Sequence, residues 1–154
     1  GEDFCSSLKT MIEAAREGFA PVKGTAVERM IAGNKKKIYL SNVKFVDDYE
    51  CYINDVSSYP ECECILATDS RITEALTASY NQYKSEIEQC LGEEWTITEQ
   101  DSSNNYYLKG KPYRKMVVSE NITGKKVKFH LYIYSNMIEK KRVVELKIEG
   151  IGKK

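Results

Sequence analysis

The stretch over residues 70–91 limits the fold of this chain more than any other. Asp69 or Ser70 can cap its start, and Gly92 can end it in the left-handed conformation. A helix of this length has an apolar strip of about 30 Å, so it needs a broad surface to pack on, which strands on both sides of it can supply. The apolar residues at helical spacing of three and four are Ile72, Leu76, Tyr80, Tyr83, Ile87, Cys90 and Leu91.

A second amphipathic helix is expected near the start of the chain, over about residues 3–18. Asp3 can cap its first turn, and Gly18 and Pro21 can end it. The apolar residues that keep the spacing are Phe4, Leu8, Met11, Ile12, Ala15 and Phe19. Residues 22–37 give a weak signal, and we interpret the lysines at 35–37 as a solvated loop.

Most of the remaining chain alternates between apolar and polar residues, which is typical of strands. In the clearest strand, 126–134, Phe129 and Leu131 belong to one face and Tyr132 and Tyr134 to the other. Cys62 and Cys64 share the inner face of another strand, opposite two glutamates. Short polar turns predict an antiparallel arrangement, with three strands between the helices and four after the second.

These elements predict the α+β class. We expect a single twisted antiparallel sheet of about six to seven strands, with the helices at about 3–18 and 70–91 packed on one face of it. The length of 154 residues suits one domain over 1–154, and the sequence has no internal repeat.

The order of elements resembles that of type III secretion chaperones and of small proteins that share their fold. The matching segments are a first helix over 4–18, a meander over 38–67, a second helix over 71–91 and further strands from residue 95. The resemblance rests on element order, without a motif. It implies an α+β fold and, by analogy, a small cytosolic dimer that holds an unfolded segment of another protein.

Five cysteines suggest disulfides. Cys5 and Cys90 can meet if the two helices run antiparallel, and Cys51 lies one strand away from Cys62 and Cys64. Cys62 and Cys64 are about 6.5 to 7 Å apart along one strand, so they are expected to seek different partners. The alternative is that several of the five are buried free thiols. Their spacing does not suit structural zinc, and we predict no metal site.

The charge balance and the cysteines bear on partners and compartment. Lys plus Arg and Asp plus Glu both number 23, which argues against nucleic acid as a partner. No apolar run reaches the roughly 18 residues that a membrane-spanning helix needs, so we expect no membrane insertion. The cysteine content and the start at Gly1 suggest a secreted or periplasmic protein whose export signal was removed, with a cytoplasmic protein as the alternative.

Neither an enzyme nor a cofactor is suggested by a motif. The sequence has no glycine-rich phosphate loop and no nucleophile elbow. Its only histidine, His130, lies in a strand on the face opposite Phe129 and Leu131, away from the inner cysteines. We therefore expect a partly exposed sheet histidine rather than a Cys–His pair.

Eleven tyrosines are the remaining unusual feature, and they suggest a recognition surface. The candidate ligand-binding face is formed by Lys126, Lys128, His130, Tyr132 and Tyr134. The alternative is that tyrosine is simply favoured in half-buried strands. The main hypothesis is a non-catalytic binding domain outside the cytoplasm for a protein, peptide or glycan. The second is a cytosolic chaperone-like or immunity-like protein-binding partner, and both leave a homodimer open.

Overall fold

The structure is a computed structural model that describes residues 2–71, 73–101, 113–136 and 141–152. Within these residues, two helices, a short 3₁₀ helix and eight strands follow one another. They are α1 (Glu2–Ala15), η1 (Ala20–Val22), β1 (Lys23–Ile31), β2 (Asn34–Ser41), β3 (Cys51–Asn54), β4 (Glu61–Asp69), α2 (Glu74–Cys90), β5 (Trp95–Asp101), β6 (Arg114–Glu120), β7 (Lys128–Asn136) and β8 (Lys141–Glu149).

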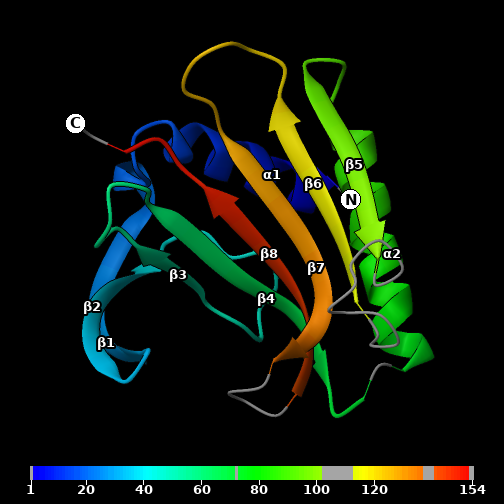
Figure 1. The fold of residues 1–154 in the computed structure, drawn as a ribbon, viewed down its shortest axis with the longest axis horizontal. Helices are drawn as coiled ribbons and strands as arrows, with labels where there is room; N and C mark the ends of the chain where they lie inside the picture. Colours follow the sequence, from blue (N-terminus) through cyan, green and yellow to red (C-terminus); the bar gives the residue numbers. More distant parts are fainter. Residues whose placement is uncertain (1, 72, 102–112, 137–140, 153–154) are drawn as a thin grey trace.

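The eight strands form one antiparallel sheet in the order β1-β2-β3-β4-β8-β7-β6-β5 (Figure 1). The α+β class and the antiparallel sheet are therefore confirmed, whereas the expected number of six to seven strands is wrong. The chain runs twice through the same series, a helix followed by four strands. The last strands of the two series, β4 and β8, pair at the centre of the sheet. The sequence has no internal repeat from which this arrangement could be predicted.

Both helices lie on the same side of the sheet, where they cover the main core (Figure 1). Cys62, Cys64, Phe129 and Leu131 all face this core and are at most 1% exposed, as the strand alternation predicts. The buried residues that α1 and α2 add are Phe4, Leu8, Met11, Ile12, Ala14, Ala15, Leu76, Tyr80 and Ile87. Because the apolar side chains of each central strand point toward the helices, the opposite face carries the polar positions.

The additional strand comes from residues 22–37, which form much of a β-hairpin rather than a loop. Its two strands carry mostly half-buried and exposed side chains. Their sequences therefore do not need, and do not show, the alternation of apolar and polar residues from which a strand is predicted. Ala32 and Gly33, at φ 51° and 81°, make a two-residue turn that matches the twist of the strands. Residues 106–110, whose sequence indicates another extended segment after the second helix, lie outside the described residues.

The helix boundaries also differ from those expected. The first helix ends at Ala15, because Gly18 and Phe19 both adopt positive φ and turn the chain toward β1. The second begins at Glu74, where Thr73 accepts a hydrogen bond from the backbone N–H of Leu76 at 3.1 Å. Thr73, rather than Asp69 or Ser70, is therefore the N-cap. Ile72, which the stripe included, is outside the described residues.

Two disulfides are formed. Cys5 at the start of α1 bonds to Cys90 at the end of α2, with their Cα atoms 5.4 Å apart, so the helices do run antiparallel. Cys51 bonds to Cys64, its direct neighbour in the β3–β4 register. Cys62 stays a buried free thiol, because its position opposite Ile53 gives it no free cysteine to pair with.

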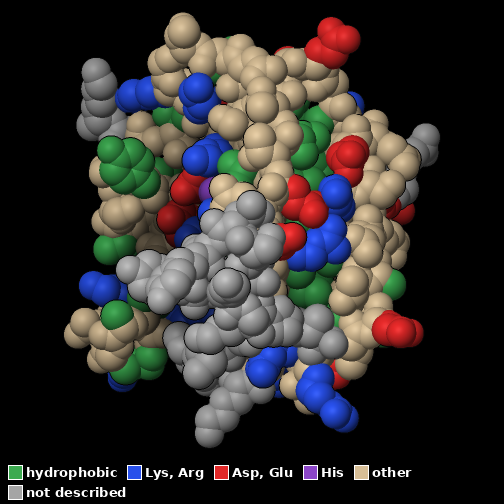
Figure 2. Space-filling model, turned by 45° about the vertical axis from the view of Figure 1, so that its right-hand side comes forward, with side chains coloured by type: hydrophobic (Ala, Val, Ile, Leu, Met, Phe, Trp, Pro, Cys, Tyr) green, Lys and Arg blue, Asp and Glu red, His purple; other side chains and the backbone are tan. Residues whose placement is uncertain are grey.

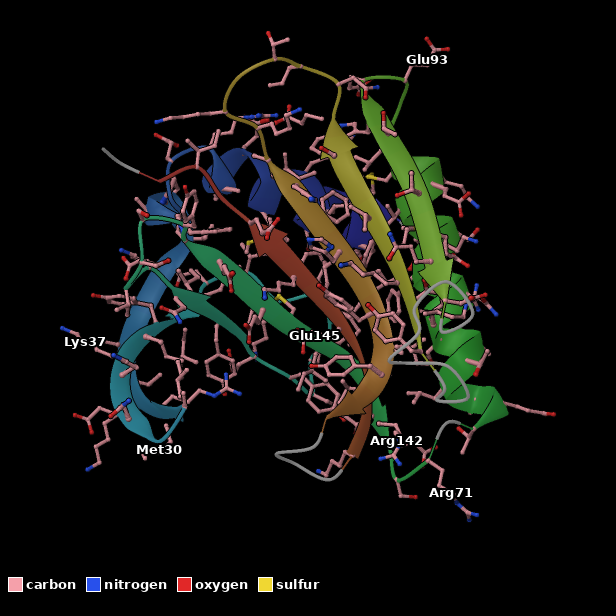
Figure 3. All side chains as sticks on the ribbon, viewed as in Figure 1. Met30, Lys37, Arg71, Glu93, Arg142 and Glu145 are labelled. Atoms are coloured by element: carbon pink, nitrogen blue, oxygen red, sulfur yellow. A yellow bond between two sulfur atoms is a disulfide. The ribbon has the colours of Figure 1, made fainter. Side chains whose placement is uncertain are left out.

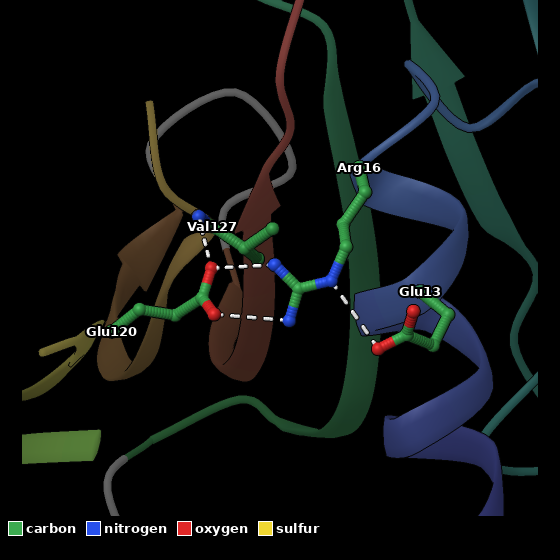
Figure 4. A network of polar contacts seen from close by, with 4 residues as sticks. All are labelled: Glu13, Arg16, Glu120 and Val127. Atoms are coloured by element: carbon green, nitrogen blue, oxygen red, sulfur yellow. Dashed lines mark hydrogen bonds and ion pairs between the residues drawn. The ribbon is translucent and has the colours of Figure 1, made fainter. Parts of the chain in front are cut away.

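A polar clamp fixes the end of α1 to the second half of the chain (Figure 4). The Arg16 guanidinium donates two hydrogen bonds to the Glu120 carboxylate, at 2.7 and 3.0 Å, and a third to Glu13 at 3.2 Å. Glu120 also accepts from the backbone N–H of Val127 at 2.8 Å. Through this carboxylate, α1, β6 and the connection before β7 are held together.

No described helix is long and apolar enough to cross a membrane.

Candidate functional site

The face of the sheet that the helices leave uncovered carries a cavity of about 660 Å³. Residues of β3, β4, β7 and β8 form its floor, and the β1–β2 hairpin forms a wall. Figure 1 shows how β1 and β2 curve back toward this face. A flat outer sheet face would offer contact area only, whereas this curvature creates a half-open hollow with the volume of a small-molecule site.

Tyrosine rings line much of the cavity. Tyr132 and Tyr134 are successive residues on the outward face of β7, and their rings meet edge to face with centroids 5.8 Å apart. Tyr52 contributes a third ring from β3, and Tyr113 a fourth from the segment before β6. Such rings offer a ligand rigid apolar area together with hydroxyl groups for hydrogen bonding.

Glu145 of β8 is the buried acid of this face, with 8% of its surface exposed (Figure 3). Its carboxylate accepts a hydrogen bond from the Tyr134 hydroxyl at 3.0 Å. Burial raises the pKa of Glu145 to about 7, and the negative charge of Glu63 on β4 acts in the same direction, while Lys147 and Arg29 act against it. Glu145 is therefore a carboxyl group that titrates near neutral pH.

The remaining charged groups of the cavity are arranged around this acid. Lys147 forms an ion pair with Glu61 at 3.4 Å. The Arg29 guanidinium lies over the Tyr52 ring, 4.5 Å from its centroid. Within the described residues, neither Glu63 nor Glu145 has an ion-pair partner. Of the three glutamates that line the cavity, only Glu61 is therefore paired with a cation.

His130 lies beside the cavity and does not line it. Its ring stacks on Tyr132 at 5.5 Å, and its Nε2 atom lies 3.3 Å from the Glu149 carboxylate. Burial lowers the pKa of His130, and its Nδ1 atom has no hydrogen-bond partner among the described residues. The expectation of a partly exposed histidine is wrong, because Tyr132 and Glu149 reduce its exposure to 6%.

The five residues of the predicted ligand face do not all line the cavity. Tyr132 and Tyr134 line the cavity, while Lys128 shares their face of β7 without lining it. Lys126 precedes β7 and borders a different hollow, beside Tyr59. The grouping of all five into one site remains untested.

Sequence reasoning missed the acids of the cavity and its arginine. The alternation of β4 and β8 does place Glu63 and Glu145 on the outer faces of their strands. It does not reveal that the two strands are neighbours, because β4 and β8 are about eighty residues apart in the chain and pair only in the folded sheet. Arg29 was missed because its segment gave no strand signal.

A second cluster lies on the helix side of the sheet. The sulfur atoms of Cys51, Cys62 and Cys64 all lie within 4.8 Å of one another. Two of them are joined as a disulfide and cannot act as thiolate ligands, and burial raises the pKa of the Cys62 thiol. The cluster therefore has the chemistry of a core contact rather than of a metal site.

Comparisons of the chain with protein-family models, with curated proteins and with solved structures found no match. Acidic and basic side chains are interspersed on the side of the molecule seen in Figure 2, without a broad area of one sign. The cavity is the most distinct chemical feature of the described residues.

Proposed function

We propose that this protein is a non-catalytic binding domain that holds its ligand in the cavity on the open face of the sheet. The observation that carries this proposal is the buried Glu145 carboxyl in a cavity lined by Tyr52, Tyr132 and Tyr134. Apolar rings around a few placed polar groups are typical of ligand sites.

The proposal places the protein outside the cytoplasm, in a secreted or periplasmic setting. Two disulfides support this, because they persist in oxidising compartments and are rare among cytosolic proteins. The alternative is a cytosolic chaperone-like or immunity-like partner of another protein, which would keep these cysteines reduced.

A screen by ¹⁵N-NMR tests whether the cavity binds ligands at all. Soluble fragments and short peptides are added to the labelled protein, and the backbone amides of Tyr52, Tyr132 and Tyr134 are expected to shift with binders. Replacing both Tyr132 and Tyr134 by alanine should weaken any such binder by about tenfold or more, since two contact rings are removed.

The matched control is Tyr59→Ala, because Tyr59 is 75% exposed and lies away from the cavity. Its binding curves should equal those of the wild type. A screen in which every binder shifts other surfaces only, or in which the double variant binds as well as the wild type, would contradict the proposed function.

A further inference from the structure

Two carboxylates face the cavity from neighbouring strands. In the β4–β8 register, Glu63 lies opposite Lys147 and Ile65 lies opposite Glu145, so the two glutamates are diagonal neighbours on one face. Diagonal side chains of an antiparallel pair are within reach of each other, and like charges there are unfavourable. The negative charge of Glu63 does act on Glu145 and opposes its ionisation.

Two other carboxylates on this face have a partner across the strands. Lys147 pairs with Glu61 across β4 and β8, and Glu149 contacts His130 across β7 and β8. Within the described residues, Glu63 and Glu145 lack an ion-pair partner of this kind. A pair of unmatched carboxylates around a cavity is suited to receive a positive group from outside the chain.

The aromatic walls suit the same kind of ligand. The face of a tyrosine ring attracts cations, and the guanidinium of Arg29 already lies over the Tyr52 ring at 4.5 Å. Tyr132 and Tyr134 stand next to Glu145 on the adjacent strand, so a ligand held at the acid would touch their rings. His130 and the Lys115 ammonium already lie against the Tyr132 ring, 5.5 and 5.4 Å from its centroid. The apolar part of the ligand would therefore contact the rest of that ring and the Tyr134 ring.

We propose that the cavity takes a primary ammonium group on an apolar stem, with the ammonium between Glu63 and Glu145 and the stem against Tyr132 and Tyr134. This inference rests on the proposed function. An ammonium has three N–H donors, which can serve two carboxylates at once, whereas a quaternary ammonium has none. A free organic amine and the lysine side chain of a peptide both offer this chemistry.

Binding of such a cation should depend on pH in a defined direction. The groups that act on the Glu145 carboxyl are Tyr134 from β7, Glu63 from β4, Arg29 from β1 and Lys147 from β8 itself. With its pKa at about 7, Glu145 is mostly protonated at pH 6 and must release the proton to hold an ammonium. Affinity should therefore rise by up to about tenfold per pH unit below pH 7 and level off above it.

The experiment compares amines with neutral analogues of the same shape. Benzylamine is paired with benzyl alcohol, and Nα-acetyl-lysine amide with Nα-acetyl-norleucine amide, in ¹⁵N-NMR titrations at pH 6, 7 and 8. Each amine should bind about tenfold or more tightly than its neutral analogue at pH 8. The stronger of the two amines identifies the free-amine or the peptide source.

Glu145→Gln and Glu63→Gln should each remove this preference for the amine and most of its pH dependence. Glu88→Gln is the matched control, because Glu88 is exposed on α2 behind the sheet. The ¹⁵N spectra of all variants verify that they remain folded.

Equal binding of amines and neutral analogues, or an amine preference that survives both cavity substitutions, would overturn the inference. If neutral ligands from the screen still shift the cavity amides, the proposed function stands while the ammonium specificity fails. If no ligand of either kind reaches the cavity, both proposals fail together.

Discussion

Glu145 combines an energetic cost to the fold with a place in the proposed binding site. Only 8% of the surface of Glu145 is exposed, so its carboxyl group gives up much of its hydration and receives one hydrogen bond in return, from the Tyr134 hydroxyl. The nearby charge of Glu63 adds to this cost. Groups that are unfavourable for the fold in this way are concentrated where proteins bind or react.

The raised pKa of Glu145 predicts that part of the stability is lost as the pH rises. The folded state keeps the proton up to about pH 7, while the unfolded chain releases it near the ordinary value of 4.5. The folded state therefore binds more protons between these values, and the free energy of unfolding should fall by up to about 3 kcal/mol across this window. Glu145→Gln should abolish that decrease.

Urea unfolding at pH 5 and pH 8 measures this effect as the difference between wild type and variant. Glu88→Gln, an exposed substitution, should leave the pH dependence of the wild type unchanged. A Glu145→Gln protein that loses as much stability as the wild type between the two pH values would show that Glu145 is ionised in the fold.

At the scale of elements, sequence periodicity predicted those parts whose side chains face the core. The stripe of α1 and the alternation of β7 were correct, because both depend on burial against one apolar surface. The β1–β2 hairpin was missed, since its curvature over the cavity leaves both of its faces partly polar. The same hairpin forms a wall of the cavity, so of the residues that line it the sequence analysis named only Tyr132 and Tyr134 as ligand-face candidates.

The clamp around Arg16 is a connection between elements whose loss should lower stability. Glu120 is 10% exposed at its side chain and accepts from both Arg16 and the Val127 backbone. We expect Glu120→Gln to lower the free energy of unfolding by about 1 to 3 kcal/mol, because a charge-assisted pair of hydrogen bonds is lost.

Glu13→Gln provides a control that acts on the same arginine. Glu13 is 72% exposed at its side chain and bonds Arg16 through a single contact on the surface, so its loss should cost less than about 0.5 kcal/mol. Equal effects of the two substitutions in urea unfolding would mean that Glu120 does not clamp the elements.

For the whole molecule, the two disulfides act at different ranges. Cys51–Cys64 joins neighbouring strands, whereas Cys5–Cys90 spans 85 residues and ties the start of α1 to the end of α2. A covalent link over a long stretch restricts the unfolded chain strongly. The tie therefore adds to the clamp in holding the first helix against the second half of the chain.

Intact mass spectrometry of protein isolated without reductant decides between the extracytoplasmic and the cytosolic proposals. Reduction of two disulfides should add about 4 Da, one hydrogen for each sulfur. Cys62→Ala should show the same gain, because Cys62 is not bonded. An unchanged mass on reduction would favour a cytosolic protein with reduced cysteines.

Because the chain runs twice through a helix and four strands, the central strands and the edge strands of the sheet contribute differently to the cavity. The paired strands β4 and β8 carry Glu63 and Glu145, while the outermost hairpin of the first series supplies a wall and the Arg29 side chain. Insertions or substitutions in that hairpin that keep Arg29 would reshape the entrance without moving the acids. Selection, or an engineer, could thus retune which molecules are admitted while leaving the central chemistry intact.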